Sequence, residues 1–286
     1  MSLKLRLVGE TDVLDLNGIA DTGYGYQALT GANGLGLPPV TPQWLEGAGD
    51  GALYRGRRVR ARDIDIPLDI VAEDREGLKD LVARLSKVLA YPCTLYIEEP
   101  SGALWYTEVI RSGGGGFVYG TDTIGQRDMQ VVITLTAGDP FFTSAELETR
   151  VIQQASGATP FLDDLSTLPL SPDQAIGTIT VENTGDAPAW PTWTVIGPGT
   201  NFQIVSPTGE LLRWEGSLAV GETLTVDTKA GTVTDGLGNN RYADLAPAPR
   251  FWAIPAGTNT VEASLSGTTT ASRIVCSWQA RKWMVV

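Results

Sequence analysis

The stretch from Thr178 to the C-terminus constrains the fold most, because apolar and polar residues alternate there in short runs separated by turn residues. Turn residues at 183–186, 207–209 and 238–240 divide these runs. The runs predict strands at residues 178–182, 191–196, 202–205, 211–214, 223–227, 232–234, 251–254, 259–265 and 273–279. Short strands at this spacing predict a β-sandwich.

The first half contains one well-defined helix pattern. Residues 73–89 place leucines and valines at helical spacing, with acidic residues at the start and Pro92 beyond the end. Alternating patterns predict strands around it at residues 3–7, 59–71, 94–98, 104–109 and 129–135. The first half is therefore expected to be β-rich with one flanking helix.

Two segments of the first half are unusual for a monomeric domain. Residues 21–56 are rich in Gly and Pro, which predicts a long loop of the kind that a partner orders. In the strand predicted at 59–71, the apolar residues change from odd to even positions near Arg62. We therefore expect one end of this strand in the domain core and the other in a subunit contact.

Length and composition favour two domains and a mostly β fold. The chain has 286 residues and 42% hydrophobic content, enough for two cores. With 33 Gly and 17 Pro against 19% charged residues, turns and strands are favoured over long helices. The predicted layout is a first domain at 1–143, a linker at 144–176 and a second domain at 177–286.

The charge balance argues against nucleic acid as a ligand, because a formal charge of −12 repels phosphates. One local exception is a basic cluster, although three acidic residues follow it at once and cancel part of its field. These basic and acidic residues are Arg55, Arg57, Arg58, Arg60, Arg62, Asp63, Asp65 and Asp69. A solvated or paired face is the simpler interpretation than a phosphate site.

Cys93 and Cys276 lie in opposite halves and suggest buried free thiols rather than a disulfide framework or metal site. Residues 1–8 alternate like a strand instead of forming the apolar stretch of a signal peptide. The sequence also has no apolar run of about 18 residues, so no membrane insertion is expected. We expect synthesis in a reducing cytosol.

The chain contains no histidine, which excludes Ser-His-Asp, Cys-His and His-Glu-x-x-His sites. The acid pairs Glu98-Glu99 and Asp163-Asp164 are the candidates for glycoside hydrolysis, but adjacent strand residues point to opposite faces. Residues 235–240 lack the closing Glu of an EF-hand and predict a turn. No catalytic, cofactor-binding or metal-ligating residue is assigned, and no cofactor is expected.

Tryptophans are concentrated in the second half, where exposed rings would suit a carbohydrate-binding module and buried rings would fill a sandwich core. Trp278 alternates in phase with core residues, whereas Trp190 and Trp283 are the better candidates for an exposed face. Core packing or partner contact is the preferred interpretation. The set comprises Trp190, Trp193, Trp214, Trp252, Trp278 and Trp283.

The order of these features resembles the distal tail protein family of siphophages, which are long-tailed, non-contractile bacteriophages. The resemblance covers nearly the whole chain. In the first half it depends on the strand at 58–70, the helix at 73–89 and the Gly-Asp-Pro-Phe-Phe motif at 138–142. In the second half it depends on residues 183–186 with Pro191, residues 221–228 and residues 257–259.

The resemblance implies a tail-tube-like β-sandwich with one flanking helix, followed by a galectin-like β-sandwich. It further implies a virion hub ring, a homohexamer at the tail tip, assembled in the host cytoplasm and joining the tail tube protein to tail-tip proteins. DNA would pass through the lumen without specific binding, and acidic residues such as Asp63, Asp65 and Asp69 would line part of it. The alternatives are a carbohydrate-binding two-domain protein and a carboxylate-dependent glycosidase. The long glycine-rich loop at 21–56 and the extended linker depart from a simple form of the family.

Overall fold

The computed structural model describes residues 3–116, 125–153 and 174–285, with side chains from residue 177 in the last range, and it divides the chain into two compact units. Unit 1 comprises Met1–Ala145 and Lys282–Val286, and unit 2 comprises Glu146–Arg281. The central part of the predicted linker, residues 154–173, lies outside the described residues. The domain boundaries given above remain a proposal.

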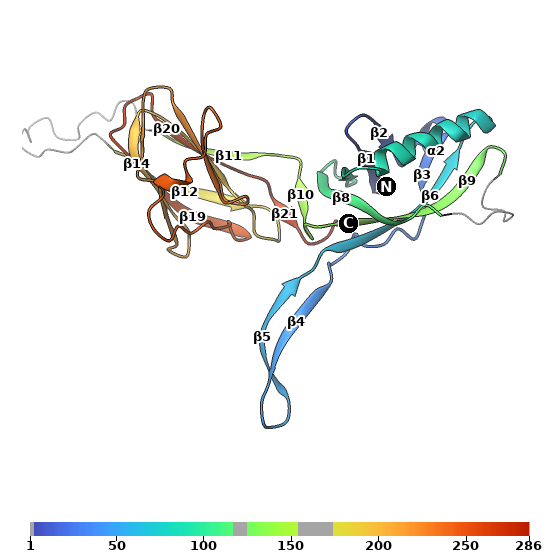
Figure 1. Cartoon of the computed structure of the whole chain (residues 1–286), viewed down its shortest axis with the longest axis horizontal. Helices are drawn as coiled ribbons and strands as arrows, with labels where there is room; N and C mark the ends of the chain where they lie inside the picture. The colour runs from blue at the N-terminus through green and yellow to red at the C-terminus, as the bar shows by residue number, and fades with distance from the viewer. Residues whose placement is uncertain (1–2, 117–124, 154–173, 286) are drawn as a thin grey trace, which may run out of the picture. The chain divides into compact units, whose positions relative to one another are not determined.

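Unit 1 is organised around one nine-stranded sheet (Figure 1). The order along the sheet is β2 (Val13–Asp15), β1 (Lys4–Val8), β7 (Cys93–Glu98), β8 (Leu104–Gly114), β9 (Asp128–Ala137), β6 (Arg62–Val71) and β3 (Gly25–Ala28). The short strand β10 (Phe142–Ser144) pairs with β8 and with β21 (Arg281–Lys282). The strands predicted at 94–98 and 104–109 are confirmed as β7 and β8, which pair with each other in antiparallel register.

Helix α2 (Arg75–Leu89) covers one face of this sheet (Figure 1). It begins after Asp74, whose side chain accepts a hydrogen bond of 2.8 Å from the backbone N–H of Gly77. Its apolar stripe is buried against the strands, and the Tyr26 hydroxyl on β3 donates to the backbone oxygen of Leu81 at 2.7 Å. The helix predicted at 73–89 is therefore confirmed. A second, short helix, α1 (Gly18–Thr22), precedes β3.

Buried and more accessible side chains alternate along β6, as expected for a sheet with one face in the core and the other face open. Ile64, Ile66, Leu68 and Ile70 are buried, whereas the intervening acidic positions lie on the opposite face. Burial of this row and of the facing residues of β9 forms the core of unit 1 beneath α2. The change of phase predicted near Arg62 occurs where the chain passes from β5 (Ala52–Val59) into β6.

Unit 2 is a sandwich of two five-stranded sheets, as predicted. One sheet has the order β11 (Glu148–Gln153), β20 (Arg273–Trp278), β13 (Thr192–Ile196), β17 (Thr223–Asp227) and β18 (Thr232–Asp235). The other has the order β12 (Gln174–Asn183), β19 (Gly257–Ser266), β14 (Gly199–Val205) and β15 (Leu211–Arg213), with β16 (Ser217–Leu218) paired to β14. A short 3-10 helix, η1 (Tyr242–Asp244), follows β18. The core between the sheets contains Trp193, Trp214, Trp252 and Trp278.

Two details of the strand prediction are wrong in unit 2. Residues 251–254 form no regular strand, because only Ile254 makes an isolated bridge, to Ala189. The segment Glu148–Gln153, which was assigned to the linker, is instead the strand β11 paired with β20. Its burial is confined to Ile152, so its sequence carries little of the alternation that identifies a strand.

Each unit contains one buried free cysteine, as expected: Cys93 in unit 1 and Cys276 in unit 2. Burial raises the pKa of the Cys93 thiol to about 11 and that of Cys276 further. Both thiols are therefore protonated and unreactive near neutral pH. Each one is a chemical reporter of the opening of its own unit.

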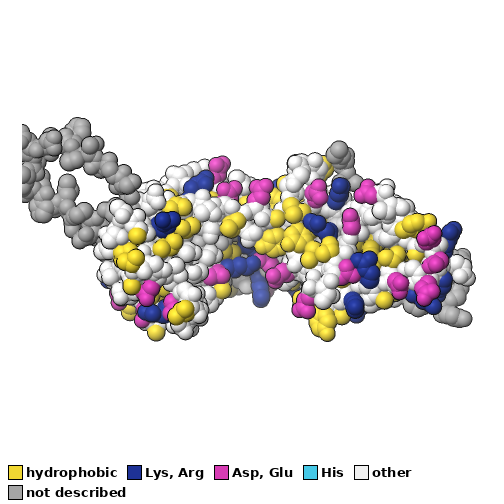
Figure 2. Space-filling view, turned by 90° about the horizontal axis from the view of Figure 1, so that it is seen from above, with side chains coloured by type: hydrophobic (Ala, Val, Ile, Leu, Met, Phe, Trp, Pro, Cys, Tyr) yellow, Lys and Arg dark blue, Asp and Glu magenta, His cyan; other side chains and the backbone are white. Residues whose placement is uncertain are grey.

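The negative net charge is not gathered into one patch on the face that Figure 2 shows. Acidic and basic side chains are interspersed there. Within the described ranges, the structure also has no helix long and apolar enough to cross a membrane.

Candidate assembly surface

The prediction that residues 21–56 form a long loop is wrong. This segment contains α1, β3 and a two-stranded hairpin of β4 (Val40–Glu46) and β5, and we call this hairpin the arm. The arm extends away from the sheet of unit 1 (Figure 1). Every residue of β4 is exposed, so burial imposes no alternation of apolar and polar residues on it.

The arm carries large apolar side chains into solvent. Trp44 is 58% exposed and Leu53 is 61% exposed, and Tyr54 and Leu45 are similar. The rings of Trp44 and Tyr54 meet edge to face with centroids 5.3 Å apart. A two-stranded hairpin is marginally stable by itself, and several large apolar side chains exposed close together mark an interaction site. The arm is therefore the strongest candidate for an assembly surface in unit 1.

The register places apolar pairs on both faces of the arm. Trp44 lies opposite Tyr54, and the next pair along, Leu45 and Leu53, points to the other face. A register shift beside Gly56, whose φ is +146°, inserts one extra residue into β5. A partner that covered only one face would leave one of these pairs in water.

The basic cluster lies on β5 of the arm and on the residues that connect β5 to β6. Arg55, Arg58 and Arg60 are exposed, and among the described residues no carboxylate lies within ion-pair distance of them. Arg57 lies over the Trp283 ring at 5.2 Å from the guanidinium carbon to the ring centroid. The arm thus combines apolar contact area with positive charge.

Arg62 is separated from that cluster, because its side chain is 1% exposed. The guanidinium lies over the Phe142 ring at 4.3 Å and donates four hydrogen bonds to backbone oxygens. Nε donates to Pro140 at 2.7 Å, Nη1 to Gly34 and Gly36 at 2.9 Å each, and Nη2 to Trp283 at 2.6 Å. One side chain therefore joins three segments of unit 1 at the base of the arm.

Burial lowers the pKa of Arg62 to about 10, while the charge of Asp139 opposes that change. The guanidinium remains charged at neutral pH, and carbonyl oxygens supply its hydrogen bonds. The basic cluster therefore exposes four arginines and not five. Arg62 is buried and holds three backbone segments together, so no surface phosphate site includes it.

The segment that leads into the arm lies directly against β6. Asn33 exchanges backbone hydrogen bonds with Asp65, at 2.9 and 3.1 Å. Gly34 has a φ of +87°, and a Cβ there would lie 2.0 Å from the backbone oxygen of Asp63. Only glycine fits at this position, and it places the carbonyl that Arg62 binds.

Three carboxylates follow the open face of β6, opposite the core. Asp63 accepts a hydrogen bond of 2.5 Å from the Thr136 hydroxyl, and Asp65 accepts one of 2.7 Å from the Thr134 hydroxyl. Burial raises the pKa of Asp69, and the charge of Asp128 raises it further. These residues form one acidic row on the sheet, as the alternation of the sequence predicts.

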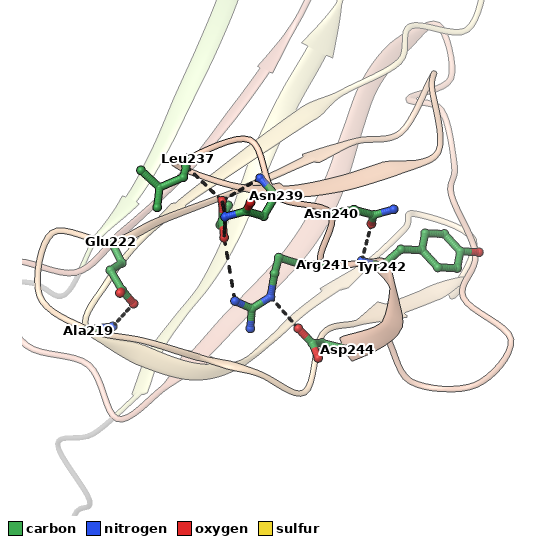
Figure 3. Close-up of polar contacts among 9 residues, drawn as sticks. Ala219, Glu222, Leu237, Asn239, Asn240, Arg241, Tyr242 and Asp244 are labelled. Atoms are coloured by element: carbon green, nitrogen blue, oxygen red, sulfur yellow. Dashed lines mark hydrogen bonds and ion pairs between the residues drawn. The ribbon is translucent and has the colours of Figure 1, made fainter.

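Unit 2 has a surface pocket of about 380 Å³ between the turn at 219–222 and the turn at 235–239 (Figure 3). Asp235 accepts hydrogen bonds from the backbone N–H groups of Leu237 and Asn239, which confirms the predicted turn. Arg241, on the pocket wall, donates to Asp244 at 2.7 Å. The polar groups around this pocket thus largely bind one another.

The other chemical candidates do not come together in the described residues. Glu99 forms an ion pair with Lys282 at 3.0 Å, and Asp163 and Asp164 lie outside the described residues. Across the described ranges, no group of three or more Cys, Asp or Glu side chains could hold a metal ion.

Among the tryptophans singled out, Trp278 is a core residue, as predicted. Trp190 and Trp283 were expected on an exposed face but are half-buried, and Trp283 packs against Phe141 with ring centroids 4.8 Å apart. The exposed tryptophan of the assembly surface is Trp44, which no sequence pattern indicated because its neighbours on β4 are exposed as well.

Comparison with known proteins places this fold among phage tail components. Residues 184–281 match the model of the siphovirus-type tail component, C-terminal domain. Among curated proteins, none matches the chain.

The whole chain is similar in fold to three solved structures. The Dit protein (gp 19.1) of phage SPP1, described as a paradigm of the hub adsorption apparatus in phages that infect Gram-positive bacteria, is 14% identical. The match has a TM-score of 0.67 and covers 98% of this chain and 99% of that one. A chain of the activated phage P2 baseplate with Ca is 11% identical, with a TM-score of 0.57 and full coverage of both chains. The activated phage p2 baseplate with Sr gives 12% identity, a TM-score of 0.52 and coverage of 97% and 98%.

The expected fold class, mostly β with a flanking helix in the first half and a β-sandwich in the second, is confirmed. The sequence match covers residues 184–281 of the second unit, and the fold match covers both units. Residues 184–281 are therefore similar in sequence to the C-terminal domain of the siphovirus-type tail component, and the whole chain has the fold of the SPP1 Dit protein.

Proposed function

We propose that this protein is the structural hub of a phage tail, a homohexameric ring that joins the tail tube protein to the tail-tip proteins. It acts in the virion, is assembled in the host cytoplasm and has no enzymatic role. The observation that carries the proposal is the arm, an exposed apolar and basic hairpin on a unit with the fold of a tail hub protein.

The arm supports ring formation because its exposed apolar and basic surface could contact a different surface on the next copy. A surface patch that contacts a different patch on the next copy generates a closed ring when the rotation closes. Both faces of the arm present apolar pairs, so a neighbouring copy that receives it would bury Trp44 and Leu53 together. Contact with an acidic surface would also neutralise Arg55 and Arg58.

The acidic row supports a lumen through which DNA passes without binding. Asp63, Asp65 and Asp69 lie on one face of β6. Carboxylates on a channel wall repel DNA phosphates within about one Debye length, roughly 8 Å at physiological salt. A wall of this kind would let the genome slide.

The proposal is tested by imaging purified protein in negative stain, with mass photometry to count subunits. Wild-type protein is expected to form closed six-membered rings. The double variant Trp44→Ser and Leu53→Ser is expected to remain monomeric, because it removes one apolar side chain from each face of the arm. A matched control is Leu237→Ser, which alters a side chain of unit 2 that is 90% exposed and lies outside the arm.

Two results would contradict the proposal. Wild-type protein that stays monomeric at every concentration and is absent from phage particles would refute the hub, and binding of that monomer to a glycan array would favour the carbohydrate-binding alternative. Rings that form equally well from the arm variant would refute the role of the arm.

A further inference from the structure

The last residues of the chain belong to the first unit. After Arg281 the chain leaves unit 2, and Lys282–Val286 is part of unit 1. Residues 282–285, which we call the clasp, contact the rest of unit 1 through three side chains and two backbone groups. Unit 1 therefore combines residues that precede unit 2 with residues that follow it.

Lys282 attaches the clasp near the turn between β7 and β8. Its Nζ lies 3.0 Å from Glu99 Oε1 and 4.3 Å from the centroid of the Trp105 ring. The two side chains of the ion pair are 29% and 13% exposed, so solvent screens the pair less than a surface one. This contact fixes the start of the clasp on the sheet.

Trp283 joins the clasp to the base of the arm. Its backbone oxygen accepts the 2.6 Å bond from Arg62, and its ring packs on Phe141 and beneath the guanidinium of Arg57 on β5. Val285 is 2% exposed, and its N–H donates to the oxygen of Leu35 at 3.4 Å. The clasp thus contacts the segment that enters the arm and the strand that leaves it.

We propose that the clasp positions the arm, so that a chain can join a ring only after residues 282–285 have been made. Synthesis produces the arm, residues 40–59, well before the clasp. Before residues 282–285 are present, Arg62 lacks one of its four acceptors and Arg57 lacks the ring beneath it. An incomplete chain then carries an arm whose base is not fixed, and it is excluded from the ring. The part concerning exclusion rests on the proposed ring.

The test compares full-length protein with a variant ending at Arg281 and with Trp283→Ala. Backbone amide exchange is measured at two hydrogen bonds of the arm's base, Asn33 N–H to Asp65 and Arg60 N–H to Pro39. Both variants are expected to exchange there faster, by about tenfold or more. Trp283→Phe keeps a ring on Phe141 and is expected to restore slow exchange. Met284→Ala, in the same segment but 37% exposed, is the matched control.

Thiol labelling and imaging complete the test. Cys276 should stay unreactive in every variant, because unit 2 does not contain the clasp. Rings, counted in negative stain, should be lost in the truncated and Trp283→Ala proteins and retained in Met284→Ala. Unchanged exchange at Asn33 and Arg60 in the truncated protein would overturn the proposal. If wild-type protein forms no ring, the hub proposal fails, and the exchange comparison still decides whether the clasp positions the arm.

Discussion

Nη2 of Arg62 donates a hydrogen bond of 2.6 Å to the backbone oxygen of Trp283, a residue 221 positions later in the chain. The same guanidinium binds the carbonyls of Gly34, Gly36 and Pro140. A single buried cation therefore holds the entry to the arm, the end of the sheet and the C-terminal residues in one arrangement. Because its ligands are carbonyl oxygens, this arrangement needs the fork of donors that only arginine provides.

Arg62→Lys is expected to destabilise unit 1 by about 2–4 kcal/mol, because one ammonium does not reach four carbonyls and leaves buried acceptors unsatisfied. The measurement is the rate of Cys93 labelling, with Cys276 as the reporter of unit 2, since one unfolding free energy does not describe a two-unit chain. Arg58→Lys alters an exposed arm position and should change the stability of unit 1, measured by Cys93 labelling, by less than about 0.5 kcal/mol. Equal labelling rates for wild type and Arg62→Lys would refute this role.

The role of Arg62 was not predictable from the sequence. It follows four exposed arginines and precedes Asp63, so the local pattern indicates a solvated charge run. Its burial depends on the loop at residues 34–36 and on Trp283, which tertiary folding brings together. By contrast, α2 and the alternation of β6 were predictable, since each buries one face and so leaves a period in the sequence.

Asn183 links two backbone segments of unit 2, the turn at residues 183–187 and residues 254–255. Its Nδ2 donates to the oxygens of Ala187, Ile254 and Pro255, and its Oδ1 accepts from the N–H of Gly185. Asn183→Ala is expected to destabilise unit 2 by about 2–3 kcal/mol, because buried carbonyls and an N–H lose their partner. This loss of stability should appear as faster labelling of Cys276 with unchanged labelling of Cys93.

Thr184→Ala is the matched control for Asn183, because this neighbour is exposed and the turn does not depend on its side chain. The same region explains one wrong strand prediction. Residues 251–254 alternate like a strand, but only Ile254 forms a bridge, to Ala189, and the Asn183 side chain binds the carbonyls of Ile254 and Pro255. A side-chain amide therefore binds the backbone where this segment ends, and no sequence pattern predicts that contact.

Acid should weaken unit 1 through Asp12. This side chain binds Arg84 on α2 through two hydrogen bonds, of 2.7 and 2.8 Å, and that pairing lowers the pKa of Asp12 from 3.8 to about 2. A carboxyl with a depressed pKa stabilises the folded state above its unfolded pKa, and the contribution is lost as the pH falls from about 3.8 through about 2. In Asp12→Asn the melting temperature of unit 1 should therefore fall less over this window than in wild type.

Asp21→Asn, an exposed position on α1, is the control for that titration. Its melting temperature should follow wild type across the window. If Asp12→Asn and wild type lost the same stability between pH 4 and pH 2, the Arg84 pair would make no net contribution, as is common for exposed ion pairs.

Replacing the acidic row should slow DNA exit from particles if these residues line the lumen. The triple variant Asp63→Lys, Asp65→Lys and Asp69→Lys places cations on one face of β6, where phosphates would bind transiently. Ejection in vitro, followed by the release of encapsidated DNA, is expected to be slower at low salt and to recover as added salt screens the attraction. The matching Asp→Asn triple variant keeps acceptors for Thr134 and Thr136 and should eject at nearly the wild-type rate. If the Lys variant assembles normally and ejects as fast as wild type at low salt, the row does not face the DNA.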